Sequence, residues 1–211
     1  QLGFVWKLEK LCRNKALKAA VEKPENVKLF LNVDGNIIQD KAFIQGFTNR
    51  KAMKAGVPAS DIVFEITERS DIENYQILQQ IMKHYADQGY EIALDDVGAG
   101  HSGLNRVVNT TPDYLKADIE LVRDIHKYKK KEIMMKLLLD YCNATGAILI
   151  AEGIETVQEL ECLHSLGVHY GQGFSLGKLE RAFGNISAES EEILERLNGR
   201  KNILFLDISG K

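Results

Sequence analysis

Two adjacent carboxylates, Asp95 and Asp96, lie where an apolar segment gives way to a glycine-rich one. Residues 91–94 have the alternation of a strand, and glycines follow at 98, 100 and 103. Because glycine lets the backbone turn at little steric cost, we expect the turn to bring both carboxylates toward one point. A close carboxylate pair usually holds a cation, shares a proton or is exposed to water. The pair predicts a cation site, and a solvated Asp-Asp turn is the alternative.

Polar side chains also stand near the ends of the other apolar segments. Asn32, Glu65 and Asp95 offer oxygen ligands from three successive segments, and Lys116 is the one cation among the later acids. Such a concentration of acids requires hard divalent cations, and Mg²⁺ or Mn²⁺ suits all-oxygen ligands. Paired metals stabilise the attacking and leaving oxygens of a phosphoryl displacement, and a lysine can neutralise developing charge. The alternative is that each acid is a helix cap or a rim charge; the further carboxylates are Glu68, Asp96, Asp118, Glu152 and Glu155.

Alternating strands and helices must position these residues. Apolar runs predict strands at 28–33, 62–68, 91–96, 114–118, 147–153 and 169–174. Helical patterns lie between them at 40–55, 72–88, 120–143 and 157–166. A first helix is expected over 4–21, where five apolar residues recur at helical spacing: Phe4, Leu8, Leu11, Cys12 and Leu17. Repeats of roughly 30 residues predict parallel strands covered by helices, as in a doubly wound sheet or a (β/α) barrel.

The parity of the strands favours the barrel. One strand face carries a polar residue near each carboxyl end, and the opposite face is apolar. Barrels build their sites at that end from several strands, whereas an open sheet concentrates polar groups at one crevice. The polar face is made of Asn32, Glu65, Asp95, Lys116, Glu152 and Gln172.

Composition places the chain among ordinary globular proteins, with 45% hydrophobic and 27% charged residues in 211. The net charge of −3 gives no basic footprint for a nucleic acid polymer. No apolar run reaches the roughly 20 residues of a membrane span, and no secretory signal is evident. The lack of a long apolar run predicts no membrane contact within the chain. The three cysteines are distant and odd in number, so we expect no disulfide framework and a reducing, cytoplasmic location.

Five motifs follow one another in the sequence. They are Phe64-Glu-Ile-Thr-Glu68, Asp95-Asp-Val-Gly-Ala-Gly-His-Ser102, Leu115-Lys-Ala-Asp118, Ala151-Glu-Gly-Ile-Glu-Thr156 and Gln172-Gly-Phe174. Together they resemble the EAL-domain family of bacterial cyclic-di-GMP phosphodiesterases. The resemblance covers about residues 1–180, and five motifs in order are far more specific than a lone glycine loop.

The resemblance implies a modified TIM barrel that hydrolyses cyclic di-GMP to linear pGpG with two metal ions. Asn32, Glu65 and Asp95 then match the ligands of one metal. Asp95, Asp96 and Glu152 match those of the second, with Asp95 as the bridge. Lys116 matches the residue that contacts the attacking water, and Gln172 lies near that chemistry.

The family pattern also implies a homodimer. Glu68 matches a glutamate that steadies the loop after Asp96, and in the family this loop lies close to the dimer interface.

The chain departs from the family pattern in three places. The Glu-Ala-Leu tripeptide of the family's first strand, whose glutamate is a metal ligand, is absent from the sequence. We therefore expect a barrel that lacks its first strand and hydrolyses cyclic di-GMP poorly or not at all by itself. Val97, Ala99 and His101 stand where the family favours Phe, Thr and Tyr, and a proline usual near Leu179 is missing.

The domain boundary is expected near residue 184. Residues 1–184 would form the incomplete barrel, and 185–211 a linker or the start of a further domain. In that tail, 186–197 has the pattern of a capped amphipathic helix, and 203–208 reads as a strand.

Three functions compete. The first is a metal-dependent cyclic-di-GMP phosphodiesterase, which the retained polar residues favour. The second is an inactive cyclic-di-GMP receptor module, which the missing upstream glutamate favours. The third is a two-metal hydrolase of another phosphodiester. Formation of pGpG with Mg²⁺ or Mn²⁺ separates them.

Overall fold

The structure, a computed structural model, describes residues 2–25, 27–35, 37–66, 75–98, 103–177 and 188–198. The chain divides into two compact units. The first contains the described residues up to Leu94 together with Asn105–Pro112. The second contains Asp95–Gly98, Gly103–Leu104 and the described residues from Asp113 onward.

Parallel strands form the framework, as the alternation predicted. Within the first unit, β1 pairs with β2 and β2 with β3; within the second, β4 pairs with β5 and β5 with β6. Consecutive strands are neighbours throughout the order β1 to β6. The strands are β1 (Leu29–Val33), β2 (Ile62–Ile66), β3 (Glu91–Val97), β4 (Tyr114–Ala117), β5 (Ile148–Ala151) and β6 (Tyr170–Gly171).

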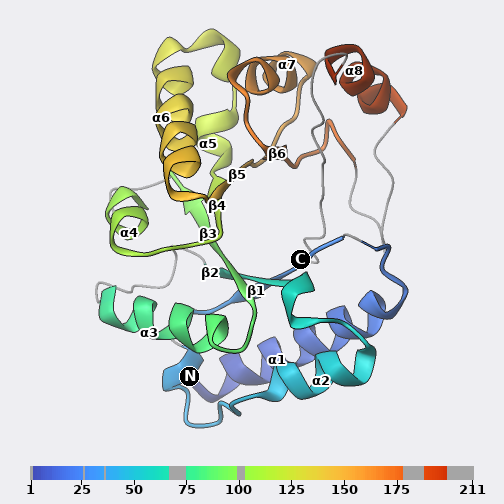
Figure 1. Ribbon diagram of the computed structural model, residues 1–211, viewed down its shortest axis with the longest axis vertical. Helices are drawn as coiled ribbons and strands as arrows, with labels where there is room; N and C mark the ends of the chain where they lie inside the picture. Colours follow the sequence, from blue (N-terminus) through green and yellow to red (C-terminus); the bar gives the residue numbers. More distant parts are fainter. Residues whose placement is uncertain are drawn as a thin grey trace. The chain divides into compact units, whose positions relative to one another are not determined.

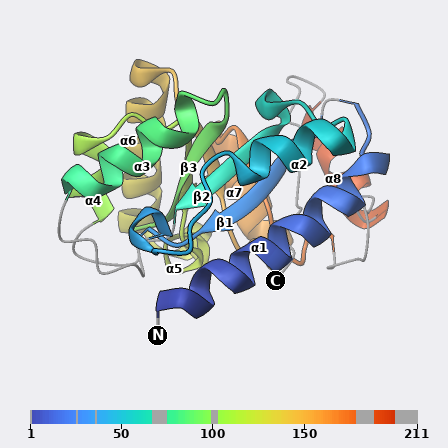
Figure 2. The same ribbon diagram turned by 90° about the horizontal axis from the view of Figure 1, so that it is seen from below.

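Helices of the first unit lie on one side of β1 and β2 (Figures 1 and 2). Its core is apolar and aromatic, because strand residues such as Phe64 pack against Tyr85 and Tyr90. The helices are α1 (Leu2–Ala19), α2 (Phe47–Ala55) and α3 (Tyr75–Ala86), with 3₁₀ turns at Ala20–Glu22, Ile37–Gln39 and Ala59–Asp61. A further helix, α4 (Gly103–Asn109), was not expected from the sequence.

Helix α1 forms where it was predicted, but most of the residues that predicted it face outward. Phe4 is 75% exposed, and Leu8, Leu11 and Cys12 are exposed as well. The buried residues of the helix are Trp6, Arg13 and Leu17, and buried Ala20 follows in the 3₁₀ turn. Arg13 could not be assigned to a core position from sequence, because its burial depends on partners in distant helices: it donates hydrogen bonds to Thr48 and Tyr85.

Helix α2 begins at Phe47, not at residue 40 as predicted. Asp40 initiates a turn, because its side-chain Oδ1 accepts the Ala42 N–H at 2.8 Å. Gly46 then takes a left-handed conformation at φ +69° immediately before the helix. A turn held by the Asp40 side chain therefore replaces the first turns of the predicted helix.

The helical elements of the second unit are α5 (Ile119–Val122), the 3₁₀ turn η4 (Ile125–Lys127), α6 (Lys129–Thr145), α7 (Val157–Leu166) and α8 (Ala188–Asn198). The single helix predicted over 120–143 is therefore wrong. The helical conformation is interrupted at Asp124, which adopts a left-handed φ of +57°. A hydrogen bond from the Asp124 N–H to Glu159 holds this break.

Helix α8 packs against α7 within the second unit. Ile193 and Leu194 are buried, Ser190 donates a hydrogen bond to the Ser175 carbonyl, and Arg196 pairs with Glu161. The predicted strand at 203–208 lies outside the described residues, and the boundary near residue 184 stays a prediction.

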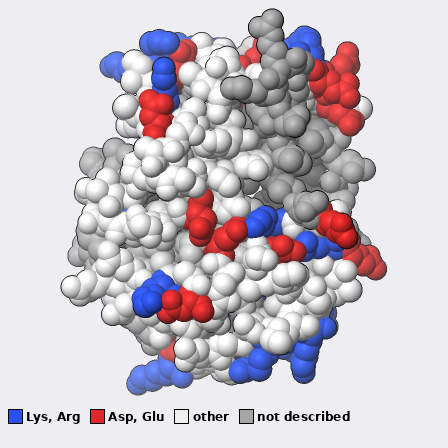
Figure 3. All heavy atoms as spheres, viewed as in Figure 1, with Lys and Arg blue, Asp and Glu red and all other residues white. Residues whose placement is uncertain are grey.

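Ionic side chains of both signs are interspersed on the face in Figure 3, where broad areas carry neither sign. The three cysteines are free, as expected. Within the residues that the structure describes, none of the helices combines the length and apolarity needed to cross a membrane.

Candidate active site

Main-chain hydrogen bonds join the carboxyl ends of consecutive strands in the second unit. Asp118 N donates to Val97 O at 3.1 Å, and Glu152 N donates to Ala117 O at 3.0 Å. Gln172 N continues the series to Ala151 O at 2.8 Å. The side chains at these ends are therefore held at neighbouring positions by the sheet itself.

Three carboxylates converge there. Ligand oxygens of Asp95, Asp96 and Glu152 all lie within 4.8 Å of one another. Lys116 Nζ lies 3.3 Å from Asp95 Oδ1 and forms an ion pair with Glu152 Oε1. Gln172 Nε2 donates to the same Glu152 oxygen at 2.8 Å. The structure thus brings together five of the predicted site residues.

The backbone conformation of Asp96 brings the two adjacent carboxylates together. Strand β3 continues to Val97, whereas the sequence suggested that Asp96 would point away from Asp95 if the strand continued. The side chain of Asp96 departs from the alternating directions of a regular strand because its backbone takes a left-handed φ of +57°. Such a conformation is costly for a non-glycine residue and is frequent at functional sites.

The charges of the cluster suit a hard cation. Lys116 is only 3% exposed, and a buried ammonium is tolerated when carboxylates compensate it. Among the described residues, Lys116 pairs with Asp95 and Glu152, and Asp96 is a third carboxylate in the same cluster. Asp95 Oδ1 is buried and has no hydrogen-bond partner among the described residues, although Lys116 Nζ lies 3.3 Å away as an ion-pair partner. An unsatisfied buried oxygen within an all-oxygen ligand set fits Mg²⁺ or Mn²⁺.

Two glycines allow the loops that carry Glu152 and Gln172 to approach closely. A Cβ at Gly153, where φ is +68°, would lie 2.4 Å from Ile119 Cγ1. A Cβ at Gly173 would lie 2.2 Å from the Ile154 nitrogen. Both positions therefore require glycine, because a side chain at either one would force the neighbouring segments apart.

The remaining predicted ligands belong to the first unit. Asn32 and Glu65 are register partners on β1 and β2, so they are neighbours there. Glu65 is 3% exposed, whereas Asn32 is exposed. Their joint role with Asp95 at a metal stays a prediction. Glu68 lies outside the described residues.

Two carboxylates counted with the site have other roles. Asp118 caps α5, because its Oδ1 accepts the Glu120 N–H at 2.7 Å; the helix-cap alternative holds for this residue. Glu155 lies 3.8 Å from Arg123 and is about half exposed.

Glu159 was missed by the site prediction, although the Thr156-x-x-Glu159 spacing of a capping box was present. Its side chain accepts three backbone N–H groups, from Asp124, Glu155 and Thr156. Burial raises the pKa of Glu159, but these hydrogen bonds outweigh it and leave the pKa below its usual value.

Comparison with known families identifies the group to which these residues belong. The family model described as the EAL domain matches residues 1–178. The chain belongs to the EAL domain family.

Curated relatives carry the same domain within longer proteins. Cyclic di-GMP phosphodiesterase PdeB of Shewanella oneidensis is 25% identical over 148 residues, which is 70% of this chain and 17% of that protein. Cyclic di-GMP phosphodiesterase PdeR of Escherichia coli is 28% identical over 159 residues, 74% of this chain and 24% of that protein. The chain therefore spans about a fifth of the length of these relatives.

Solved EAL structures share the fold. Klebsiella pneumoniae BlrP1, in complex with calcium and cyclic di-GMP, aligns with a TM-score of 0.74 and 29% identity, covering 80% of this chain and 43% of that one. A standalone EAL protein from Vibrio cholerae in its cyclic-di-GMP-bound form gives 0.78 and 26%, with 88% and 79% coverage. The fold is thus α/β and TIM-like, as predicted.

Proposed function

We propose that this chain is a metal-dependent phosphodiesterase domain that hydrolyses cyclic di-GMP to linear pGpG. The observation that carries the proposal is the convergence of Asp95, Asp96 and Glu152 around buried Lys116 in an EAL domain. Relatives named as phosphodiesterases of this nucleotide, and EAL structures in complex with it, support the substrate.

Asp95, Asp96 and Glu152 would hold divalent cations, with Asp95 shared between two ions. Asn32 and Glu65 would complete the ligand set on the family pattern. Mg²⁺ or Mn²⁺ is proposed because every one of these donors is an oxygen. The cations would neutralise phosphoryl charge and supply hydroxide near neutral pH.

Lys116 would act on the water that attacks phosphorus. Its ammonium is anchored by Asp95 and Glu152 and is almost wholly buried, so it can donate a hydrogen bond in a fixed direction. A fixed positive charge in a water-poor site also stabilises negative charge that develops on the phosphoryl oxygens.

Gln172 would orient Glu152. Its amide donates to Glu152 Oε1 at 2.8 Å, and this hydrogen bond holds the carboxylate in a defined direction. Groups that orient a ligating carboxylate in this way typically contribute tenfold to a hundredfold in metal affinity or activity.

A substitution at Lys116 tests the chemistry apart from binding. Lys116→Ala should lower kcat by on the order of 10²-fold or more while changing cyclic-di-GMP affinity much less, because its contact matters most in the transition state. Lys129→Ala removes an exposed lysine paired with Glu132 and is the control. Equal losses of kcat and affinity at Lys116 would assign that residue to ligand binding. Tight binding by wild-type protein without hydrolysis would instead indicate a receptor.

The family pattern further suggests a homodimer, which sedimentation of the purified protein tests. A reducing cytoplasmic compartment remains our expectation, and the three free cysteines are compatible with it.

A further inference from the structure

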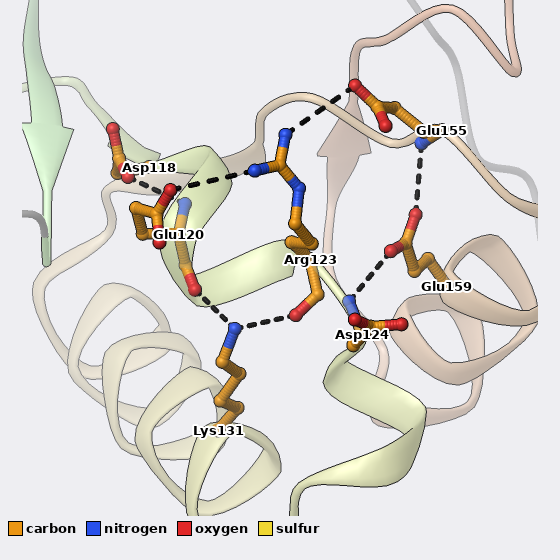
Figure 4. Close-up of polar contacts among 7 residues, drawn as sticks. All are labelled: Asp118, Glu120, Arg123, Asp124, Lys131, Glu155 and Glu159. Atoms are coloured by element: carbon orange, nitrogen blue, oxygen red, sulfur yellow. Dashed lines mark hydrogen bonds and ion pairs between the residues drawn. The ribbon is translucent and has the colours of Figure 1, made fainter.

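One carboxylate outside the acidic cluster joins two segments of the second unit. Glu159 is 2% exposed and lies in the first turn of α7. Its Oε1 accepts the N–H of Asp124 at 2.7 Å, and its Oε2 accepts that of Glu155 at 3.0 Å (Figure 4). The same Oε2 also accepts the N–H of Thr156 at 3.0 Å. Each carboxylate oxygen therefore serves a different side.

Helix capping explains only the Oε2 side. Thr156 Oγ1 accepts the Glu159 N–H at 3.3 Å, and Glu159 returns a bond to Thr156 N, which completes a capping box. Asp124 lies 35 residues earlier, at the left-handed break between α5 and η4. A capping box does not require that contact.

The joined segments follow β4, which carries Lys116, and β5, which ends directly before Glu152. Asp118–Asp124 continues from β4, and Glu152–Thr156 continues from β5. The segments are packed without a gap, since Gly153 has no room for a Cβ beside Ile119. Arg123 adds weaker ties, because its guanidinium lies 3.7 Å from Glu120 and 3.8 Å from Glu155.

Lys131 fixes the same turn from the other side. Its ammonium donates to the carbonyl oxygens of Glu120 and Arg123, at 2.5 and 2.6 Å (Figure 4). Asp124 is therefore held in a defined place, and the Glu159 contact transfers that placement to the loop after β5. The exposed Arg123 pairs contribute little, because water screens them.

We propose that Glu159 is a positioning residue that maintains the alignment of Lys116 with Glu152 by tying the segment after β4 to the loop after β5. It touches no reacting group. Its kinetic effect depends on the proposed phosphodiesterase function, whereas its effect on the loop does not.

Substitutions can separate the tie from the cap. The amide of Glu159→Gln has one acceptor oxygen in place of two. Glutamine is well accepted at this capping-box position, so its side-chain oxygen can accept the Thr156 N–H. Its NH₂ group then faces the Asp124 N–H, and no hydrogen bond forms there because both groups are donors. Thr156→Ala does the reverse, because it removes the hydroxyl cap and leaves the tie to Asp124.

The experiment compares the two variants with wild type by amide hydrogen exchange and by steady-state kinetics with Mn²⁺ and cyclic di-GMP. Glu159→Gln should accelerate exchange at Asp124 and Glu152 and lower kcat by tenfold or more, with KM nearly unchanged, since small misplacements of reacting groups are costly. Thr156→Ala should lower the melting temperature but leave kcat and exchange at Glu152 unchanged.

Two results would overturn the proposal. One is wild-type exchange at Glu152 and Asp124 in Glu159→Gln. The other is a kcat loss in both variants that follows their loss of stability, which would make Glu159 a helix cap only. If wild-type protein forms no pGpG, the proposed function fails, yet the exchange measurement still decides the role of Glu159.

Discussion

The contact between Gly173 and Ile154 gives a quantitative test of how the site is positioned. A Cβ at residue 173 would lie 2.2 Å from the Ile154 nitrogen and 2.3 Å from its oxygen. Ordinary contact begins near 3.4 Å, so Gly173→Ala must separate the two loops by about 1 Å. Backbone atoms cannot move aside as a flexible side chain can.

That separation acts on two loops that carry site residues. Ile154 N donates to Gln172 O and Ser175 N donates to Ile154 O, both at 3.0 Å. Weakening these bonds and overpacking the contact should cost on the order of 3 kcal/mol of unfolding free energy. Because Gln172 orients Glu152, a shift of about 1 Å should lower kcat by on the order of 10²-fold.

The assay is hydrolysis of cyclic di-GMP with Mn²⁺, at a temperature where denaturant titration shows each variant folded. Gly146→Ala is the matched control, since Gly146 also has a left-handed φ, +81°, but nothing within 4 Å of an added Cβ. It should lose about 1 kcal/mol of stability and no turnover. Wild-type kcat in folded Gly173→Ala, or equal losses in both variants, would refute the positioning argument.

Two further outcomes test interactions outside the acidic cluster. Arg13→Met should lower the free energy of unfolding by about 3–5 kcal/mol in denaturant titration, because it leaves the partly buried Glu9 carboxylate without its cationic partner. Arg196→Met, which removes an exposed ion pair, should cost less than about 1 kcal/mol. Similar costs for the two variants would contradict the interpretation of Arg13 and Glu9 as a buried ion pair. Burial lowers the pKa of His169, and neutral His169 accepts the Leu149 N–H through Nδ1 at 2.9 Å. The folded state therefore binds a proton at His169 less tightly than the unfolded chain does. The stabilisation that neutral His169 contributes is complete above about pH 6.5 and is lost as pH falls through the lower pKa of the folded state. His169→Gln should remove this part of the pH dependence of the melting temperature, and an unchanged pH dependence would show that His169 does not cause it.

Strand positions and most of the site could be predicted from the sequence. Apolar runs with one polar residue near the end are a local signal, and parallel strands align their carboxyl ends. This reasoning placed Asp95, Lys116, Glu152 and Gln172 on a common face, and the structure brings them together.

Features that depend on distant partners could not be predicted. The apolar pattern of 120–143 is continuous, and the break at Asp124 is held by Glu159, 35 residues later. The left-handed backbone of Asp96 could not be predicted either, because aspartate adopts that conformation more often than most residues but only at a minority of its positions. In α1 the exposed side chains of Phe4 and Leu8 carry the same helical period as the buried residues.

Formation of pGpG from cyclic di-GMP by wild-type protein and Asp95→Asn, each with saturating Mn²⁺, tests the central claim most directly. Asp95 has the buried, unsatisfied oxygen and lies within 4.8 Å of the other two carboxylates, so its neutralisation removes charge shared by the cluster. The account predicts pGpG formation by wild type, at the low rate expected without the upstream glutamate, and a further loss on the order of 10²-fold or more in the variant. Near-wild-type turnover by Asp95→Asn, or binding without pGpG formation by wild type, would contradict it.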